Sequence, residues 1–177
     1  MKKYEFTGET KEIRLLFRTA TLHRIRATVA FGIVEVGDLG GWIEKEENLS
    51  HEGKAWVCGD AEVCGDAKVC GDAEVCGDAK VWGNAKVCGD AEVFSASHVL
   101  VIGAIGSRND FTTFYRDKDN EITVKCGCFL GKIDRFLEKV TQTHGDSKYA
   151  LVYRAAVEVA KLQIDLSGEA PKDADEE

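Results

Sequence analysis

The chain has 177 residues, but it contains only one proline and one methionine, and it has no long apolar run. Without a stretch of about 18 consecutive apolar residues, the sequence predicts no membrane-spanning helix. The first residues, Met1 to Glu5, include charged side chains at once, and they lack the apolar segment of a signal peptide. We therefore expect a cytoplasmic protein whose thiols are reduced.

An excess of basic residues is also absent. The chain carries 23 Lys and Arg against 31 Asp and Glu, a net charge of −8. General nucleic-acid binding requires clustered Lys and Arg, so this composition excludes it. Residues 167–177 hold one lysine against five acidic residues, together with the only proline. Such a segment is typical of a disordered acidic tail.

Glycine and cysteine, in contrast, are abundant, with 18 and 7 residues. An odd number of cysteines argues against a simple disulfide framework. Valine recurs every six residues from Val57 to Val99, and alanine lies two residues before it from Ala55 to Ala91. Neither the 3.6-residue period of a helix nor a hairpin explains this spacing. Residues two apart in a strand face the same side, so Ala and Val point inward while Gly-Asp forms the corners.

The unit Val-Cys-Gly-Asp-Ala-Glu/Lys resembles the hexapeptide-repeat family of left-handed parallel β-helices, over residues 55–99. The resemblance implies that three hexads form one turn of 18 residues, and that the flanking segments cap the exposed ends. The expected fold class is therefore mainly β: a short left-handed parallel β-helix, or hexapeptide solenoid, with an N-terminal β cap and a small C-terminal α+β module. Because hexapeptide proteins commonly trimerise, the resemblance also implies a homotrimer.

A second resemblance involves the block Gly-Asp-Leu-Gly-Gly-Trp-Ile-Glu-Lys-Glu-Glu-Asn-Leu-Ser at residues 37–50. It is similar to uncharacterised hexapeptide proteins of phages and prophages, which implies a phage-encoded protein in the host cytoplasm. Within this block, Gly40-Gly41 followed by Trp42 predicts a tight turn that places an aromatic side chain inside the first turn of the repeat.

Four segments follow from these patterns: an N-terminal β cap and entry turn (1–54), the repeat (55–99), an α+β module (100–166) and the tail (167–177). In the module, apolar alternation predicts strands at 99–105, 112–116 and 121–126. Helical spacing predicts one helix from Ile133 to Val140, ended by Gly145, and another from Tyr149 to Ala160, with Asp146 or Ser147 as its N-cap.

An 18-residue turn stacks residues 18 apart at roughly 4.8 Å. Cys58 then lies on Cys76, and Cys70 on Cys88. Because β-carbons at this spacing lie farther apart than the usual disulfide value near 3.8 Å, we expect no bridge; a thiol ladder that binds a soft metal or senses redox state is the alternative. Lys68 meets Lys86, which argues against a designed salt-bridge ladder. The repeat is therefore interpreted as a scaffold.

The module holds the candidate site. Its loop from Gly106 to Asp110 offers backbone N–H groups, a hydroxyl and a guanidinium, a set suited to a small anionic or nucleotide-like ligand. The predicted ligand-binding residues are Ser107, Arg108, Asn109, Thr113, Lys125, His144 and Tyr153. An ordinary connecting turn is the alternative. Cys126 and Cys128 with His144 supply too few ligands for zinc, and a Cys–His nucleophile remains a further alternative. No cofactor or metal is expected.

These observations predict a non-enzymatic, oligomeric binding protein that sequesters a nucleotide-like immune signal at the C-terminal module or between subunits. Two other hypotheses remain. One is a structural, assembly or host-protein-binding module. The other is a hexapeptide acyltransferase, which needs a general-base histidine beside the repeat; residues 52–97 contain no histidine.

Overall fold

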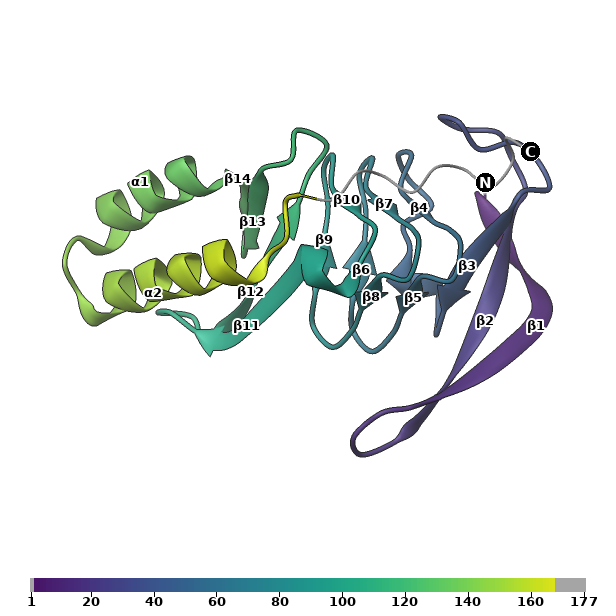
Figure 1. Cartoon of the computed structure of the whole chain (residues 1–177), viewed down its shortest axis with the longest axis horizontal. Coiled ribbons are helices and arrows are strands. Elements are labelled where there is room, and N and C mark those ends of the chain that lie inside the picture. Colours follow the sequence, from purple (N-terminus) through teal and green to yellow (C-terminus); the bar gives the residue numbers. More distant parts are fainter. Residues whose placement is uncertain (1, 168–177) are drawn as a thin grey trace.

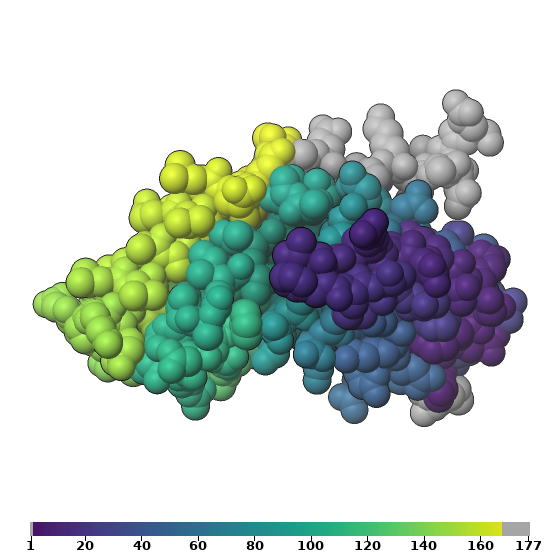
Figure 2. Space-filling model, turned by 90° about the horizontal axis from the view of Figure 1, so that it is seen from below, coloured from purple at the N-terminus to yellow at the C-terminus, as the bar shows by residue number. Residues whose placement is uncertain are grey.

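The structure is a computed structural model that describes residues 2–167. A long hairpin lies at one end, the short strands of the repeat lie in the middle, and the helices lie at the other end (Figure 1). The helices, yellow-green, occupy one end of the space-filling view as well (Figure 2). The strands are β1 (Tyr4–Arg14), β2 (Thr19–Ala27), β3 (Leu39–Ile43), β4 (Trp56–Val57), β5 (Glu62–Val63), β6 (Lys68–Val69), β7 (Glu74–Val75), β8 (Lys80–Val81), β9 (Lys86–Val87), β10 (Glu92–Val93), β11 (Val99–Ile105), β12 (Asp110–Arg116), β13 (Ile122–Cys126) and β14 (Phe129–Lys132). The helices are α1 (Ile133–His144) and α2 (Lys148–Gln163), and two 3-10 turns cover Glu46–Asn48 and Ala96–His98.

Each hexad contributes one two-residue strand, which pairs in parallel with the strand eighteen residues before or after it in the chain. Val63 lies beside Val81, and Val69 beside Val87. The alanine and valine columns are buried in one core, as the Ala-x-Val spacing predicts. The glycines at the corners adopt positive φ, for example +73° at Gly71, a conformation that other residues rarely adopt. The predicted 18-residue register is therefore confirmed.

The expected fold class, a short left-handed parallel β-helix, is wrong as stated. Residues 2–167 form several small sheets: one mixed sheet (β1-β2-β3-β5-β8), two parallel sheets (β10-β7-β4 and β6-β9) and one antiparallel sheet (β11-β12-β13-β14), together with two helices. No solenoid is identified among them. The physical reason lies in the corners, because a Gly-Asp turn in every hexad leaves only two extended residues between turns. The mixed sheet also continues into the antiparallel β1–β2 hairpin.

Side chains from the N-terminal flank satisfy backbone groups at one end of the repeat. The Lys3 Nζ atom donates to the carbonyl oxygen of Ala55 at 2.7 Å, and Asn48 Nδ2 donates to that of Ala67 at 2.8 Å. Lys3 is buried, and this burial lowers its pKa to about 8 despite the attraction of Asp72. An exposed strand edge would leave such groups open to other chains, so this flank protects the end.

The prediction of a tight turn at Gly40-Gly41 is wrong, because both residues lie within strand β3. A β-carbon on Gly40 would lie 2.5 Å from Ile25 Cγ1 and 2.7 Å from the carbonyl oxygen of Val57. Glycine is thus required for the close approach of two backbones rather than for a bend. Trp42 stays half-buried beneath Lys11 and Arg24, and Trp56 is the tryptophan in the core.

The C-terminal module combines an antiparallel four-stranded sheet with two packed helices. The predicted strands and helices of this module are confirmed within a few residues: α1 ends at Gly145 and α2 begins after Ser147. Strand β14 was not predicted. No helix among residues 2–167 has both the length and the apolar character that crossing a membrane requires. The predicted acidic tail lies outside the described residues, apart from Ser167.

Two disulfides correct the prediction of reduced thiols. Cys58 is bonded to Cys76, and Cys70 to Cys88, with Cα atoms 4.6 Å apart in each pair. This separation lies within the usual disulfide range of about 4.4–6.8 Å. The prediction equated the spacing of β-carbons with that of the strands, although side chains can incline toward each other. Cys64 remains a thiol, and burial, followed by the charge of Glu44, raises its pKa to about 11.

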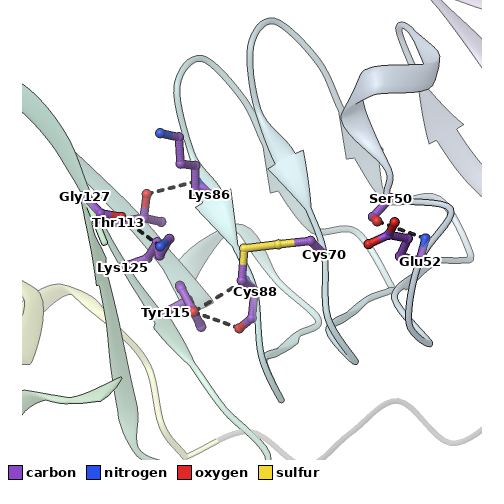
Figure 3. Close-up of a disulfide and its surroundings, with 9 residues drawn as sticks. All are labelled: Ser50, Glu52, Cys70, Lys86, Cys88, Thr113, Tyr115, Lys125 and Gly127. Carbon is purple, nitrogen blue, oxygen red and sulfur yellow. Dashed lines mark hydrogen bonds between the residues drawn. A yellow bond between two sulfur atoms is a disulfide. The ribbon is translucent and has the colours of Figure 1, made fainter. Parts of the chain in front are cut away.

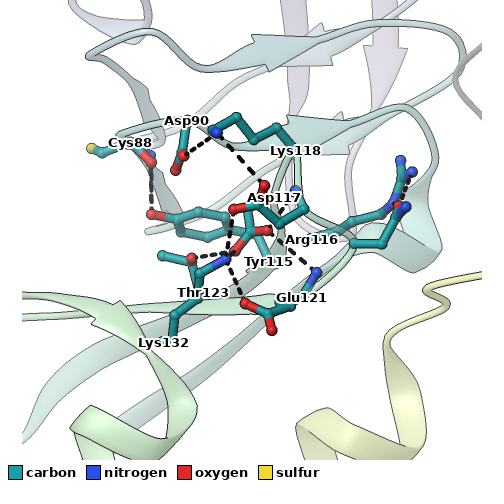
Figure 4. A network of polar contacts seen from close by, with 11 residues as sticks. Cys88, Asp90, Tyr115, Arg116, Asp117, Lys118, Glu121, Thr123 and Lys132 are labelled. Atoms are coloured by element: carbon teal, nitrogen blue, oxygen red, sulfur yellow. Dashed lines mark hydrogen bonds and ion pairs between the residues drawn. The ribbon is translucent and has the colours of Figure 1, made fainter.

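A buried carboxylate orders the part of the module that pairs with the last hexads (Figure 4). The side chain of Asp117 is fully buried and accepts hydrogen bonds from Lys132 Nζ and Thr123 Oγ1, both at 2.6 Å. The backbone of Asp117 forms an antiparallel β-bridge with Ala91 of the repeat. The backbone N–H of Lys118 donates to the carbonyl oxygen of Asp90 at 3.1 Å. Burial alone would raise the pKa of Asp117, but the hydrogen bonds from Lys132 and Thr123 outweigh it and lower the pKa.

Replacing Asp117 by asparagine is expected to reduce the free energy of unfolding by about 2 kcal/mol at pH 7, because the hydrogen bonds from Lys132 and Thr123 lose their charged acceptor. Lys132 keeps its ion pair with the exposed Glu121 at 2.9 Å. The folded pKa lies below the unfolded value of about 3.9, so the carboxylate stabilises the fold above about pH 4 and less so as the pH falls. The difference between wild type and Asp117→Asn should therefore shrink at pH 3 in urea titrations. Asp119→Asn, half-exposed, is the control, with an effect below about 1 kcal/mol. An equal deficit at pH 3 and pH 7 would contradict this role.

Candidate functional site

The structure separates the predicted site residues onto two faces of the antiparallel sheet. Side chains alternate along a strand, so Phe114 of β12 faces the helices, whereas its neighbour Tyr115 enters the core of the repeat. Thr113 and Lys125 are cross-strand partners in β12 and β13, and Thr113 faces the repeat. The predicted residues therefore do not all face one side of the sheet.

The residues on the helix side are engaged in packing. Tyr153 is buried, lies 3.9 Å from Cys126 Sγ and stacks against His144 with ring centroids 5.8 Å apart. Burial, and then the neighbouring Cys126, raise the pKa of Tyr153 to about 12. Gly106 has φ +71°, and a β-carbon there would overlap the Tyr153 hydroxyl. Ser107, Arg108 and Asn109 are exposed on a turn closed by the hydrogen bond from Asn109 N to the Gly106 carbonyl oxygen, which favours the alternative of a connecting turn.

The residues on the repeat side belong to a different arrangement (Figure 3). The Thr113 hydroxyl oxygen accepts a hydrogen bond from the backbone N–H of Lys86 at 3.0 Å, and the Tyr115 hydroxyl donates to the Cys88 carbonyl oxygen at 2.8 Å. Strand β12 thus covers the outer edge of β9, as the N-terminal flank covers the opposite end. Lys125 lies beside Thr113 and donates from Nζ to the carbonyl oxygen of Gly127 at 2.8 Å.

Three lysines follow one another across β6, β9 and β13. We call Lys68, Lys86 and Lys125 the lysine strip. Lys68 and Lys86 occupy directly paired positions of the parallel strands β6 and β9, and both are exposed. Within residues 2–167, neither of these two ammonium groups forms an ion pair or a side-chain hydrogen bond. Like charges in directly paired positions destabilise a sheet, so the fold retains an unfavourable pair on the surface of a chain with net charge −8.

An open groove of about 480 Å³ adjoins the strip at Lys68, between β6 and the segment after the first 3-10 turn. Its lining includes Ser50, His51 and Cys70, and also the acidic Glu46 and Glu47. Glu46 is neutralised by Lys2 at 2.5 Å. Burial, and to a smaller extent nearby Lys2 and Lys3, lower the pKa of His51 against the attraction of Glu46, so its imidazole is neutral at pH 7.

This arrangement can hold negative charge. Lysine ammonium groups are compact, rotatable donors that bind phosphate oxygens as point charges. Lys68 and Lys86 present such donors from adjacent strand positions, and Lys125 is the cross-strand partner of Thr113, which bonds the Lys86 backbone. Ser50 lines the groove beside Lys68. No group of three or more His, Cys, Asp or Glu side chains in the described part of the chain is placed to hold a metal ion.

Sequence reasoning reached Thr113 and Lys125 but missed Lys68 and Lys86. The signal was available, because the 18-residue register already placed these two lysines side by side. The pairing of Lys68 with Lys86 was interpreted only as evidence against a salt-bridge ladder. The contribution of the module could not be predicted, because it depends on how β12 packs on the edge of β9.

Comparison with known proteins supplies no further identification: no family model matches the chain, and no curated protein matches its sequence. The resemblance to hexapeptide proteins of phages therefore stays a prediction.

Removing one charge from the strip is expected to stabilise the fold. Lys86→Gln should raise the free energy of unfolding by about 0.5 kcal/mol at low salt, because it relieves the repulsion by Lys68. The gain should vanish near 1 M NaCl, where the screening length falls to about 3 Å. Lys80→Gln is the matched control: Lys80 lies opposite Glu62, so its removal should destabilise by a similar amount. Urea titrations at both salt concentrations give the sign of the change in the free energy of unfolding for each variant. A destabilised Lys86→Gln would contradict a repulsive pair.

Proposed function

We propose that this chain is a non-enzymatic binding protein for a small polyanion, with the lysine strip as its site. One observation carries the proposal: Lys68 and Lys86 lie in directly paired positions without an acidic partner in the described part of the chain. A ligand with two or more adjacent negative charges would neutralise both amines at once, and so convert a repulsive pair into a favourable one.

The ligand class is a phosphate-bearing molecule such as a nucleotide. The phosphates would lie on Lys68 and Lys86, with Lys125 at the end formed by the module. Thr113 is buried, and its hydroxyl holds β12 against β9. The groove beside Lys68 offers about 480 Å³ for the remainder of such a ligand, and cavities of this size are typical of small-molecule sites. We place this binding in the cytoplasm, where phosphorylated metabolites and nucleotide signals occur.

Isothermal titration with pyrophosphate and with ATP tests the proposal. Wild type should bind both, with an affinity that falls as salt rises. Lys68→Gln combined with Lys86→Gln should weaken binding by roughly tenfold or more, since two charge-assisted contacts are lost. Lys139→Gln combined with Lys148→Gln, which removes two exposed lysines from the helices, matches the change in net charge and should bind like wild type. Failure of wild type to bind either probe, or equal losses in both variants, would contradict the lysine strip.

A second candidate, assembly into a homotrimer or with another protein, is favoured by the outer face of α2. This helix buries one side against the module. Its opposite side exposes Leu151, Val152, Val159 and Leu162, and the side chain of Leu162 is 90% exposed. Val152, Ala155, Val159 and Leu162 follow the three-and-four spacing of a helix-pairing seam. A helix that is apolar on both sides is normally covered on both, so we propose that a second copy of the chain covers this one.

Light scattering coupled to size-exclusion chromatography tests the assembly. Wild type at micromolar concentration should have the mass of three chains, and Val159→Lys combined with Leu162→Lys should reduce it to that of one. Glu138→Lys, an exposed change on α1, adds positive charge elsewhere and should leave the mass unchanged. A monomeric wild type would exclude α2 as a self-association surface.

A further inference from the structure

One disulfide connects the two strands that carry the lysine strip. Cys70 directly follows β6 and Cys88 directly follows β9, so each cysteine lies two residues after Lys68 or Lys86. The bridge holds the Cα atoms of the two cysteines 4.6 Å apart. In Figure 3 it spans the gap between the neighbouring turns, next to Lys86 and to the Tyr115 hydroxyl of the module.

The strands that this disulfide joins share the core of the repeat through Val69 and Val87, but few backbone contacts connect them directly. β6 and β9 form a sheet of their own, with two residues in each strand. Three backbone hydrogen bonds connect this stretch, from the N–H groups of Lys68, Cys70 and Asp72 to carbonyl oxygens of the next turn, at 2.8–3.0 Å. The Lys68–Lys86 repulsion acts against this pairing. Within the described residues the disulfide is the one covalent cross-link between the two strands, and it holds together the backbones that carry the two amines.

We propose that the Cys70–Cys88 disulfide is a redox control of anion binding at the lysine strip, an inference that rests on the function proposed above. With the bridge closed, Lys68 and Lys86 are held side by side and can bind one polyanion together. With the bridge open, repulsion separates the two amines, so a ligand must first bring them together and binds more weakly.

The chemical step is thiol–disulfide exchange with a dithiol, either a small molecule or a reducing protein. Cys70 is half-buried and Cys88 is buried, so an incoming thiolate reaches the sulfur of Cys70. The S–S bond breaks, its electron pair leaves on Cys88, and that thiolate takes up a proton. The second thiol of the reductant then releases Cys70 as a thiol and forms the reductant's own disulfide, so that the dithiol is oxidised as the protein is reduced.

Linkage makes the effect reciprocal. If the closed bridge favours the anion, the bound anion must favour the closed bridge by the same factor. A polyanion on the strip should therefore protect the Cys70–Cys88 disulfide from reduction, while a chloride control at equal ionic strength should not.

The chain contains its own matched control in the Cys58–Cys76 disulfide, which joins β4 to β7 rather than the lysine-bearing strands. Cys58→Ser with Cys76→Ser leaves only the bridge beside the strip. Cys70→Ser with Cys88→Ser leaves only the control bridge. Each full-length variant is titrated with pyrophosphate in oxidised form and after reduction with dithiothreitol, with circular dichroism as the check that both forms remain folded.

Reduction should weaken pyrophosphate binding about fivefold or more in wild type and in Cys58→Ser/Cys76→Ser, and should have no effect in Cys70→Ser/Cys88→Ser. Equal affinities before and after reduction in Cys58→Ser/Cys76→Ser would overturn the redox control while leaving the anion site intact. Absence of pyrophosphate binding in every form would instead refute the proposed function, and this inference with it. If reduction unfolds a variant, the fraction of Cys70–Cys88 that is reduced at equilibrium in a dithiothreitol redox buffer, measured by alkylation and mass spectrometry, decides: it must fall when pyrophosphate is present.

Discussion

The parallel register of eighteen residues determines where the paired lysines and the paired cysteines of the proposed site lie. The inward alanines and valines pack in columns because of it, and the outward residues stack in the same way. Outward residues eighteen positions apart therefore lie side by side, whether they are two cysteines, two lysines or a lysine and a glutamate. The lysine strip and the disulfide beside it are two results of the same constraint, and neither exists in a single hexad.

Much of the arrangement of the repeat could be predicted from the sequence. The Ala-x-Val spacing gave the core columns, and the Gly-Asp corners gave the positions of the turns. The fold class did not follow from them, because the strands between corners are too short to form one continuous helix of strands and assemble into separate small sheets. The disulfides were rejected on an assumed β-carbon spacing, although the strand separation of 4.6 Å allows them.

The candidate site was less predictable because it combines a local and a non-local element. Lys68 and Lys86 are brought together by the repeat alone. Thr113 joins them only because β12 covers the edge of β9, where its hydroxyl accepts the Lys86 N–H. The alternation of β12 and β13 separates Thr113 and Lys125 from Tyr153 and His144, and this period of two was visible in the sequence. Which face would meet the repeat was not visible, since that depends on how the module docks.

The docking of Tyr115 into the repeat core has a consequence for how the gene can change. Repeated DNA gains and loses units by recombination, and each unit here encodes six residues. Loss of one hexad would move every later side chain onto a different sheet, so Tyr115 and Asp117 would face the wrong column at the end of the repeat. Loss or gain of three hexads would preserve both. The length of the repeat is therefore expected to vary among relatives in steps of eighteen residues.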